Sequence, residues 1–116
     1  MVRIERVYDY LSREKSGSEH VVLVDRIWPR GVSKASLPLD EWAKDLGPST
    51  ELSKWFGHDP QRWAEFRRRY TAELKDRRDE LERLAEISAK GTLTLLYSAK
   101  DERHNQAVLA DVLGGE

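Results

Sequence analysis

The sequence predicts a single small α/β domain, a Rossmann-like arrangement in which helices pack on an at least partly parallel sheet of three or four strands. Two apolar, β-branched runs of strand length, residues 21–24 and 92–98, predict strands that are buried on both faces. The segments between and after them show helical spacing of apolar residues. Strands separated by helices favour parallel pairing, and 116 residues leave room for one core.

Composition narrows the class of protein further. The chain is 39% hydrophobic and 35% charged, with 20 basic and 21 acidic residues and a net charge of −1. A charge this close to zero draws the protein to neither nucleic acid nor membranes. No apolar run is long enough to cross a bilayer, the N-terminus lacks a signal peptide, and there is no cysteine for disulfides or thiolate chemistry. We expect a soluble, cytoplasmic protein with no membrane partner.

The first half of the chain contains the weaker patterns. Residues 2–8 alternate apolar and charged side chains, which predicts a strand with one solvent-facing side. Residues 12–19 are polar and read as a turn, and residues 29–38 contain two prolines and a glycine, which predicts the longest loop. Residues 39–48 are compatible with a short edge strand or an irregular turn, and their spacing does not decide between the two.

The helices carry clearer signals. Residues 49–56 predict a short helix capped by Ser49 or Thr50 and ended by Gly57. A second helix begins at Asp59 and Pro60, and its buried stripe is predicted to comprise Trp63, Phe66, Tyr70 and Leu74. Helical spacing continues to Lys90 with a bend or break near residues 76–79, so one helix or two are possible. The last helix ends at Gly114, with Asp101 as its expected cap.

Unusual polar residues concentrate in two loops, residues 25–34 and 97–105, each of which follows a predicted buried strand. The carboxyl ends of adjacent parallel strands open on one crevice, where α/β proteins bind ligands. Guanidinium groups, ammonium groups and helix N–H groups around such a crevice suit phosphate, sulfate or carboxylate. We therefore predict a site for a small anionic molecule. Its expected ligand contacts are Arg26, Trp28, Arg30, Lys34, Lys100 and Asn105, and its candidate proton-transfer groups are Tyr97 and Asp101.

A purely structural interpretation of the same residues is equally open. Arg26 could pair with Asp40 or Glu41, Trp28 and Pro29 could close the end of the sheet, and Asp101 could only cap a helix. No P-loop, G-x-G-x-x-G or G-x-S-x-G motif is present, and the three histidines lack metal-ligand spacing. The sequence therefore predicts no cofactor and no metal, and it leaves both enzymatic activity and oligomeric state open.

A second candidate surface is the basic face from Arg62 to Arg69, which includes three consecutive arginines. Such a cluster could contact a phosphate backbone, which would make the protein a non-enzymatic regulatory or nucleic-acid-interacting protein. Glu65, Glu73 and Asp76 lie within reach for ion pairs along a helix, so a solvated, charge-paired face is the stronger interpretation. Nucleic acid is thus the less favoured partner.

Four long segments, residues 25–34, 42–49, 49–70 and 95–110, closely resemble the YeaO-like family of small bacterial proteins, a domain family of unknown function. The resemblance covers nearly the whole chain and implies a compact, cytoplasmic α/β fold with no established activity. Its signature corresponds here to Arg26, Trp28, Pro29, Arg30 and Gly31. The chain departs from the pattern at Ser98, where a glycine is expected in many relatives.

Overall fold

The protein is built around a four-stranded, fully parallel sheet in the order β1-β4-β2-β3. The strands are β1 (Val2–Arg6), β2 (Glu19–Leu23), β3 (Glu41–Trp42) and β4 (Thr92–Tyr97). The computed structural model describes residues 1–15, 17–98 and 105–114. This architecture confirms the predicted α/β class, and it makes the whole sheet parallel where the sequence required only part of it.

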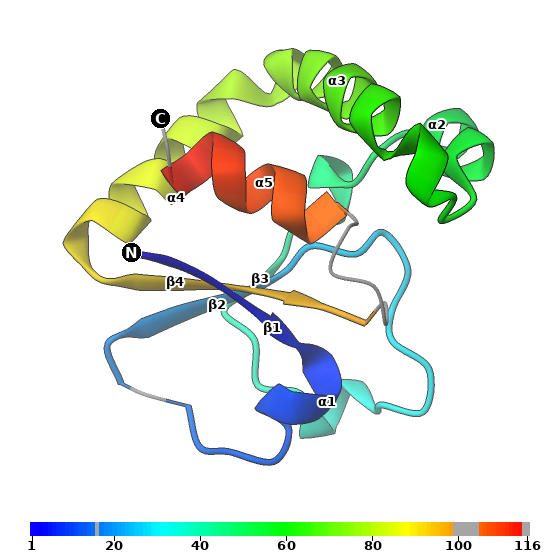
Figure 1. Ribbon diagram of the computed structural model, residues 1–116. Coiled ribbons are helices and arrows are strands. Elements are labelled where there is room, and N and C mark those ends of the chain that lie inside the picture. Colours follow the sequence, from blue (N-terminus) through cyan, green and yellow to red (C-terminus); the bar gives the residue numbers. More distant parts are fainter. Residues whose placement is uncertain (16, 99–104, 115–116) are drawn as a thin grey trace.

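Helices cover the two faces of the sheet unequally. The helices are α1 (Val7–Tyr10), α2 (Thr50–Phe56), α3 (Trp63–Leu74), α4 (Arg78–Lys90) and α5 (Asn105–Gly114). Helices α2 to α5 lie over one face, here called the helical face, whereas α1 and the loops lie over the other, here called the loop face (Figure 1). No helix in the described part of the chain is long and apolar enough to cross a membrane.

The main core lies under the helical face. Phe56 and Phe66 stack at 4.2 Å between ring centroids, and Phe66 contacts Tyr70 at 5.7 Å. These rings pack in one cluster with Val22 and Leu95 of the central strands. Burial of this aromatic stripe is the main stabilising contribution of α3, because helix propensity alone is too weak to hold a helix of this length.

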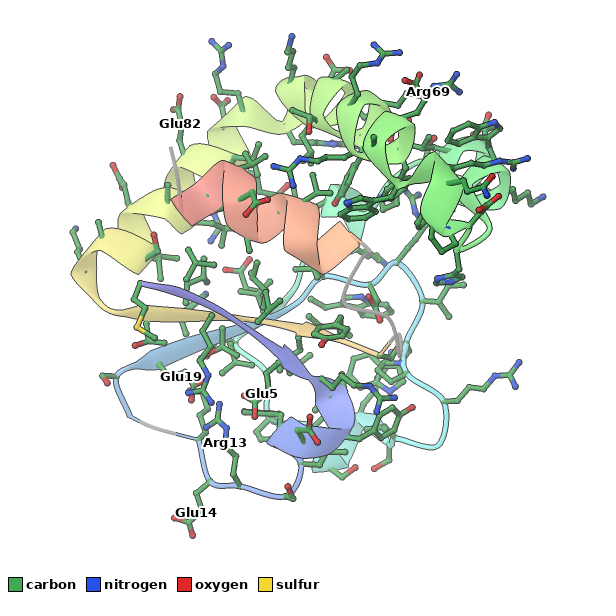
Figure 2. All side chains as sticks on the ribbon, in the orientation of Figure 1. Glu5, Arg13, Glu14, Glu19, Arg69 and Glu82 are labelled. Atoms are coloured by element: carbon green, nitrogen blue, oxygen red, sulfur yellow. The ribbon has the colours of Figure 1, made fainter. Side chains whose placement is uncertain are left out.

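The loop face has a smaller apolar cluster and a polar end. Val7, Tyr10, Leu23 and Leu96 are buried on it beside the carboxyl ends of the strands. Toward the other end, Arg13 extends from the loop after α1 and lies between Glu5 and Glu19 below the sheet (Figure 2). Among the described residues this face carries no helix longer than α1, and one arginine and two carboxylates lie against its polar end.

Several local predictions need correction. The strand predicted over residues 2–8 ends at Arg6, because Val7 and Tyr10 are spaced as on a helix and both become buried in α1. The turn predicted to extend through Glu19 ends before it, since Glu19 already pairs with β4. The strand predicted at residues 21–24 accordingly comprises Glu19–Leu23.

The structure also resolves what the sequence left open. Residues 39–48 form a two-residue edge strand, β3, followed by a 3-10 turn at Lys44–Leu46. The stretch ending at Lys90 is two helices, α3 and α4, joined by a 3-10 turn at Lys75–Arg77. Ser49 caps α2 and Gly57 ends it in the left-handed conformation, as predicted. The expected cap, Asp101, lies outside the described residues.

Candidate functional site

The carboxyl edge of the sheet has the topology of an α/β ligand site. β2 and β4 are adjacent and parallel, with Leu23 opposite Leu96. The connection after β2 runs over the loop face, where Trp28, Val32 and Leu37 pack, whereas β4 leads to α5 on the helical face. Chain connections that leave neighbouring strands toward opposite faces open a crevice between the strand ends, which is where open α/β sheets bind ligands.

The two predicted loops contact each other at this edge through Asp25 and Ser98. The Asp25 carboxylate oxygen Oδ2 accepts hydrogen bonds from the Ser98 backbone N at 2.9 Å and from Ser98 Oγ at 2.7 Å. The Ser98 carbonyl in turn accepts from Nη2 of Arg6 at 3.3 Å. Residues from the ends of β1, β2 and β4 therefore form one hydrogen-bonded group, and Ser98 contributes both its backbone and its hydroxyl to it.

Arg26 has different partners from those considered in the sequence. Its Nη2 donates to the carbonyl oxygens of Gly47 at 3.1 Å and Pro48 at 2.9 Å, so it fixes the segment before α2. Within the described residues it does not pair with Asp40 or Glu41, which bind other groups. Arg26 also borders a pocket of about 160 Å³ on the helical side, together with Asp45, Gly47, Ser49, Tyr70, Glu73, Leu74, Asp76 and Arg77.

A lysine and tryptophan group lies on the loop side of the same edge. The rings of Trp28 and Trp42 meet edge to face at 5.1 Å between centroids. The Lys34 ammonium lies 5.9 Å from the Trp28 centroid and 5.7 Å from that of Trp42, and the Lys44 ammonium lies 4.9 Å from Trp42. Trp28 Nε1 donates to the Val32 carbonyl at 2.6 Å, and Pro29 is buried, so both residues also close the end of the sheet.

The remaining predicted site residues are placed as follows. Arg30 is exposed, and its carbonyl accepts from the Tyr8 hydroxyl at 3.1 Å. Tyr97 is only 6% exposed and lies at the end of β4. Lys100 and Asp101 lie outside the described residues, and Asn105 begins α5 with a side chain that is likewise not described. Arg26 and Lys34 contact different parts of the molecule rather than one common partner.

Sequence reasoning missed three participants, Arg6, Asp25 and Lys44. A signal for the cations was available: β1 ends with Arg6, Arg26 follows β2 closely, and Lys44 follows β3 closely. In a parallel sheet all of these positions lie at the same edge. Asp25 could not be recognised from its type alone, because its role depends on the distant backbone of Ser98.

A second ionic group joins β3 to α4. The Glu41 carboxylate accepts from Arg83 Nη1 at 2.7 Å and Nη2 at 2.8 Å, and it lies 2.8 Å from His20 Nε2. The hydrogen bonds from Arg83 lower the pKa of Glu41 to about 2, an effect that burial opposes and His20 reinforces. This group fixes the edge strand that carries Trp42.

We expect Arg83→Ala to raise the pKa of Glu41 toward the ordinary value for glutamate. The folded-state pKa lies below the unfolded one, so Glu41 stabilises the fold above its unfolded pKa and loses this contribution as the pH falls toward about 2. The stability difference between wild type and variant should therefore shrink over that acidic range. Carboxyl-carbon NMR titration measures the pKa directly, and an unchanged Glu41 pKa in the variant would contradict this account.

The basic face of α3 is largely paired. Arg68 and Arg69 both bind Glu65, at N–O distances of 2.5 and 2.7 Å, and Arg67 binds Asp111. Glu65 therefore takes the role expected of it, whereas Glu73 instead accepts from the backbone N and hydroxyl of Ser49. Ion pairs therefore run along this face. Its arginines would have to break their bonds to intramolecular carboxylates in order to bind an external phosphate.

No group of three or more His, Asp or Glu side chains is placed to hold a metal ion in residues 1–15, 17–98 and 105–114. The sheet edge instead offers guanidinium, ammonium, hydroxyl and backbone N–H groups. These groups bind anions and carbonyl oxygens.

Comparison with known proteins places the chain in a family. It matches the family model described as the inactive DUF488-N3 subclade over residues 1–116. It is 50% identical to the uncharacterized protein YeaO of Escherichia coli over 113 residues, covering 97% of this chain and 96% of that protein. It is 37% identical to an uncharacterized protein of Mycobacterium tuberculosis over 115 residues, covering 98% and 94%. No solved structure matches. The chain therefore belongs to the inactive DUF488-N3 subclade, a YeaO-like family of unknown function.

Proposed function

We propose that this protein binds a small anionic molecule, bearing phosphate, sulfate or carboxylate, at the carboxyl edge of the sheet between the loops after β2 and β4. The observation that supports this function most is the Asp25–Ser98 pairing, which joins the two loops at the point where the chain leaves adjacent strands toward opposite faces. Ligands of α/β sheets bind at this point. The sheet edge thus has the right topology and a closed, hydrogen-bonded base.

The charges at the edge favour an anion. Arg6 ends β1, Arg26 and Lys44 closely follow β2 and β3, and Lys34 lies over the tryptophan pair. Asp25 carries the opposing charge, but its carboxylate oxygen Oδ2 already accepts two hydrogen bonds from Ser98. Charge-assisted hydrogen bonds from arginine and lysine are about twice as strong as neutral ones, so such an edge selects negatively charged groups. Arg30, Lys100 and Asn105 complete the proposed set of contacts.

We favour a function in which the protein binds the anion without converting it chemically. The family model carries the word inactive in its description, which supports a binding role for this chain. The low exposure of Tyr97 leaves little of its ring available to a ligand. If the bound molecule is turned over, Tyr97 and Asp101 are the groups to which we assign proton transfer. We propose that the protein binds this anion in the cytoplasm, where phosphorylated metabolites are abundant.

Titration with inorganic phosphate and pyrophosphate tests this function. We expect the backbone amide signals of Asp25 and Ser98 to shift in NMR spectra of the wild type. The double variant Arg30→Gln, Lys34→Gln should weaken binding at least about tenfold, because each lost charge-assisted contact contributes about 1.5–3 kcal/mol. Both side chains are exposed, so the variant should fold normally.

Arg68→Gln is the matched control, since it removes one exposed guanidinium that lies on α3 and pairs with Glu65. This variant should bind as the wild type does. Equal affinity in all three proteins, or signals that shift only on α3, would overturn the proposed site. The latter result would favour the competing nucleic-acid function of Arg62 to Arg69, which should weaken steeply with added salt.

A further inference from the structure

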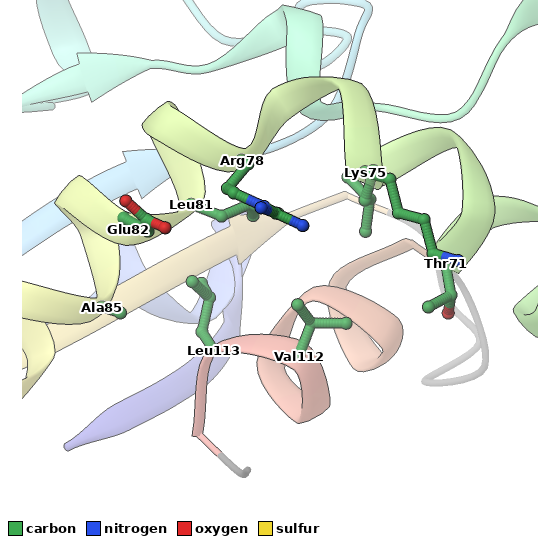
Figure 3. A pocket seen from close by; sticks show the side chains of 9 residues that line it. Thr71, Lys75, Arg78, Leu81, Glu82, Ala85, Val112 and Leu113 are labelled. Carbon is green, nitrogen blue, oxygen red and sulfur yellow. The ribbon is translucent and has the colours of Figure 1, made fainter.

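We infer a second, independent binding site: a groove between α3, α4 and α5 that takes an anionic amphiphile, a small molecule with one carboxylate head and an apolar tail. The groove has a volume of about 280 Å³. One wall comes from the end of α3 and from α4, and the other from α5 (Figure 3). Its lining residues are Thr71, Leu74, Lys75, Arg78, Leu81, Glu82, Ala85, Val112 and Leu113.

The base of the groove and the wall formed by α5 are apolar. Leu74 is buried at its base, and Leu81 and Leu113 pack partly against the main core. Val112 remains 38% exposed, which makes it one of the few exposed large apolar side chains among the described residues. Covering such side chains stabilises a complex by about 25 cal/mol per Å² of apolar surface removed from water. The groove can therefore hold an alkyl or aryl group.

The wall formed by α4 and the turn before it carries two cationic side chains that bind no other described residue. Lys75 and Arg78 are both exposed, and within the described part of the chain their side chains make no hydrogen bond or ion pair. The neighbouring arginines of α3 behave differently, because Arg67, Arg68 and Arg69 each bind a carboxylate. Positive charge is thus available where it borders the apolar groove and neutralised farther along α3.

The positions of the charged side chains determine the orientation in which the ligand binds in the groove. In Figure 3 the Lys75 side chain extends toward Thr71 at the α3 end of the groove, Arg78 stands in the middle, and Glu82 stands farther along α4, on the side of Ala85. A carboxylate head should bind between Lys75 and Arg78, where its oxygens can accept hydrogen bonds from both. A second negative group at the Ala85 end would meet Glu82, so a single head group and an uncharged tail fit best.

The dimensions favour a small molecule over a protein segment. The volume lies near the lower end of the range of about 300–1,000 Å³ that is typical of small-molecule pockets. The site is also separate from the proposed function, because α5 begins at the carboxyl edge of the sheet and the groove lies along Val112 and Leu113 near its other end. A negative binding result at one site therefore does not count against the other site.

Titration with decanoate below its micelle concentration tests this inference. We expect the methyl NMR signals of Val112, Leu81 and Leu113 to shift saturably, while the amide signals of Asp25 and Ser98 stay in place. Decanol, which has the same tail without the charge, should bind at least about tenfold more weakly. The double variant Lys75→Gln, Arg78→Gln should lose about the same factor for decanoate and nothing for decanol.

Arg67→Gln is the matched control, since Arg67 lies on α3 outside the groove and pairs with Asp111. It should bind decanoate as the wild type does. Absence of saturable methyl shifts overturns the site, and equal affinities for decanoate and decanol overturn the role of the cations. A Val112→Ser variant that binds decanoate as tightly as the wild type would overturn the apolar contact.

Discussion

Replacing Arg13 with methionine should lower the free energy of unfolding by about 2–4 kcal/mol near neutral pH, as measured by urea denaturation. Removing one partner of a buried ion pair typically costs about 3–5 kcal/mol, because the remaining charge stays buried without compensation. The lower end of that range applies here, since the Arg13 side chain retains 26% exposure and part of its interaction is screened by water.

The expected loss is large because one guanidinium neutralises two carboxylates. Nε and Nη2 of Arg13 donate to Glu5 at 3.0 and 2.8 Å, and Nη2 and Nη1 donate to Glu19 at 2.6 and 3.2 Å. The hydrogen bonds that Arg13 donates to Glu5, followed by those that it donates to Glu19, raise the pKa of Arg13. The Glu19 side chain is 2% exposed and also accepts from the hydroxyl of Thr94, so it cannot turn to solvent when Arg13 is lost.

This destabilisation should depend on pH. Without Arg13, two neighbouring carboxylates share a largely buried site with no cation between them, so burial and mutual repulsion disfavour their charged forms. The penalty is therefore present where both groups are ionised, and it disappears at acidic pH, where they take up protons. The gap between variant and wild type should narrow at acidic pH, and adding Glu19→Gln to Arg13→Met should recover part of the loss at pH 7.

Arg3→Gln is the control for this prediction. Arg3 also approaches Glu5, at 3.6 Å, but its side chain is 43% exposed, and exposed ion pairs contribute about 0–1 kcal/mol. It should change stability little at any pH. An Arg13→Met variant that loses less than about 1 kcal/mol, or a loss that stays constant from acid to neutral pH, would show that the two carboxylates reach other partners.

Asp25→Ala is expected to have the second largest effect, a loss of about 2–3 kcal/mol in stability. Hydrogen bonds to a charged group contribute about 1.5–3 kcal/mol, and a donor left unpaired adds to the loss. The substitution removes the acceptor of both Ser98 bonds, so the residue after β4 loses its side-chain contact with the loop after β2. Hydrogen exchange of the Ser98 amide should accelerate at least about tenfold, because local opening becomes easier.

Ser98→Ala separates the two bonds. It removes the hydroxyl donor but keeps the backbone N–H to Asp25, so it should cost only about 1 kcal/mol and leave the amide protected. In the double variant the effect of Ser98→Ala should vanish, since its acceptor is already absent. Additive losses, or an unaltered exchange rate in Asp25→Ala, would mean that the two loops are held together by other contacts. Anion binding by both variants also shows how far the proposed site depends on the Asp25–Ser98 contact.

Local patterns in the sequence were sufficient for most elements. The apolar run of β4 and the ring spacing of Phe66 and Tyr70 on α3 report which side chains become buried, because the pleat of a strand and the turn of a helix repeat over a few residues. The cap at Ser49 and the left-handed Gly57 are equally local. The pattern misled only where it was short, as at Val7, whose helical spacing to Tyr10 competes with strand alternation.

The strand ends that frame the candidate site were predictable, whereas the contacts of its residues were not. Buried strands followed by polar loops were enough to predict parallel neighbours, and the structure has β2 and β4 side by side. The partners of Arg26 were not predictable, because the carbonyls of Gly47 and Pro48 carry no signal of residue type. The Asp25–Ser98 contact likewise joins residues far apart in the chain.

The sequence by itself determined the α/β class, the ends of α2 at Ser49 and Gly57, and the ring spacing of Phe66 and Tyr70, whereas the helix expected from Asp59 and Pro60 begins at Trp63 after a 3-10 turn. Only the tertiary structure decided the strand order β1-β4-β2-β3, the pairing of Arg13 with Glu5 and Glu19, and the meeting of the two strand-end loops. The physical reason is the range of the interactions. Periodicity and capping depend on residues within a turn of one another, whereas strand order and ionic partners depend on which distant segments pack together.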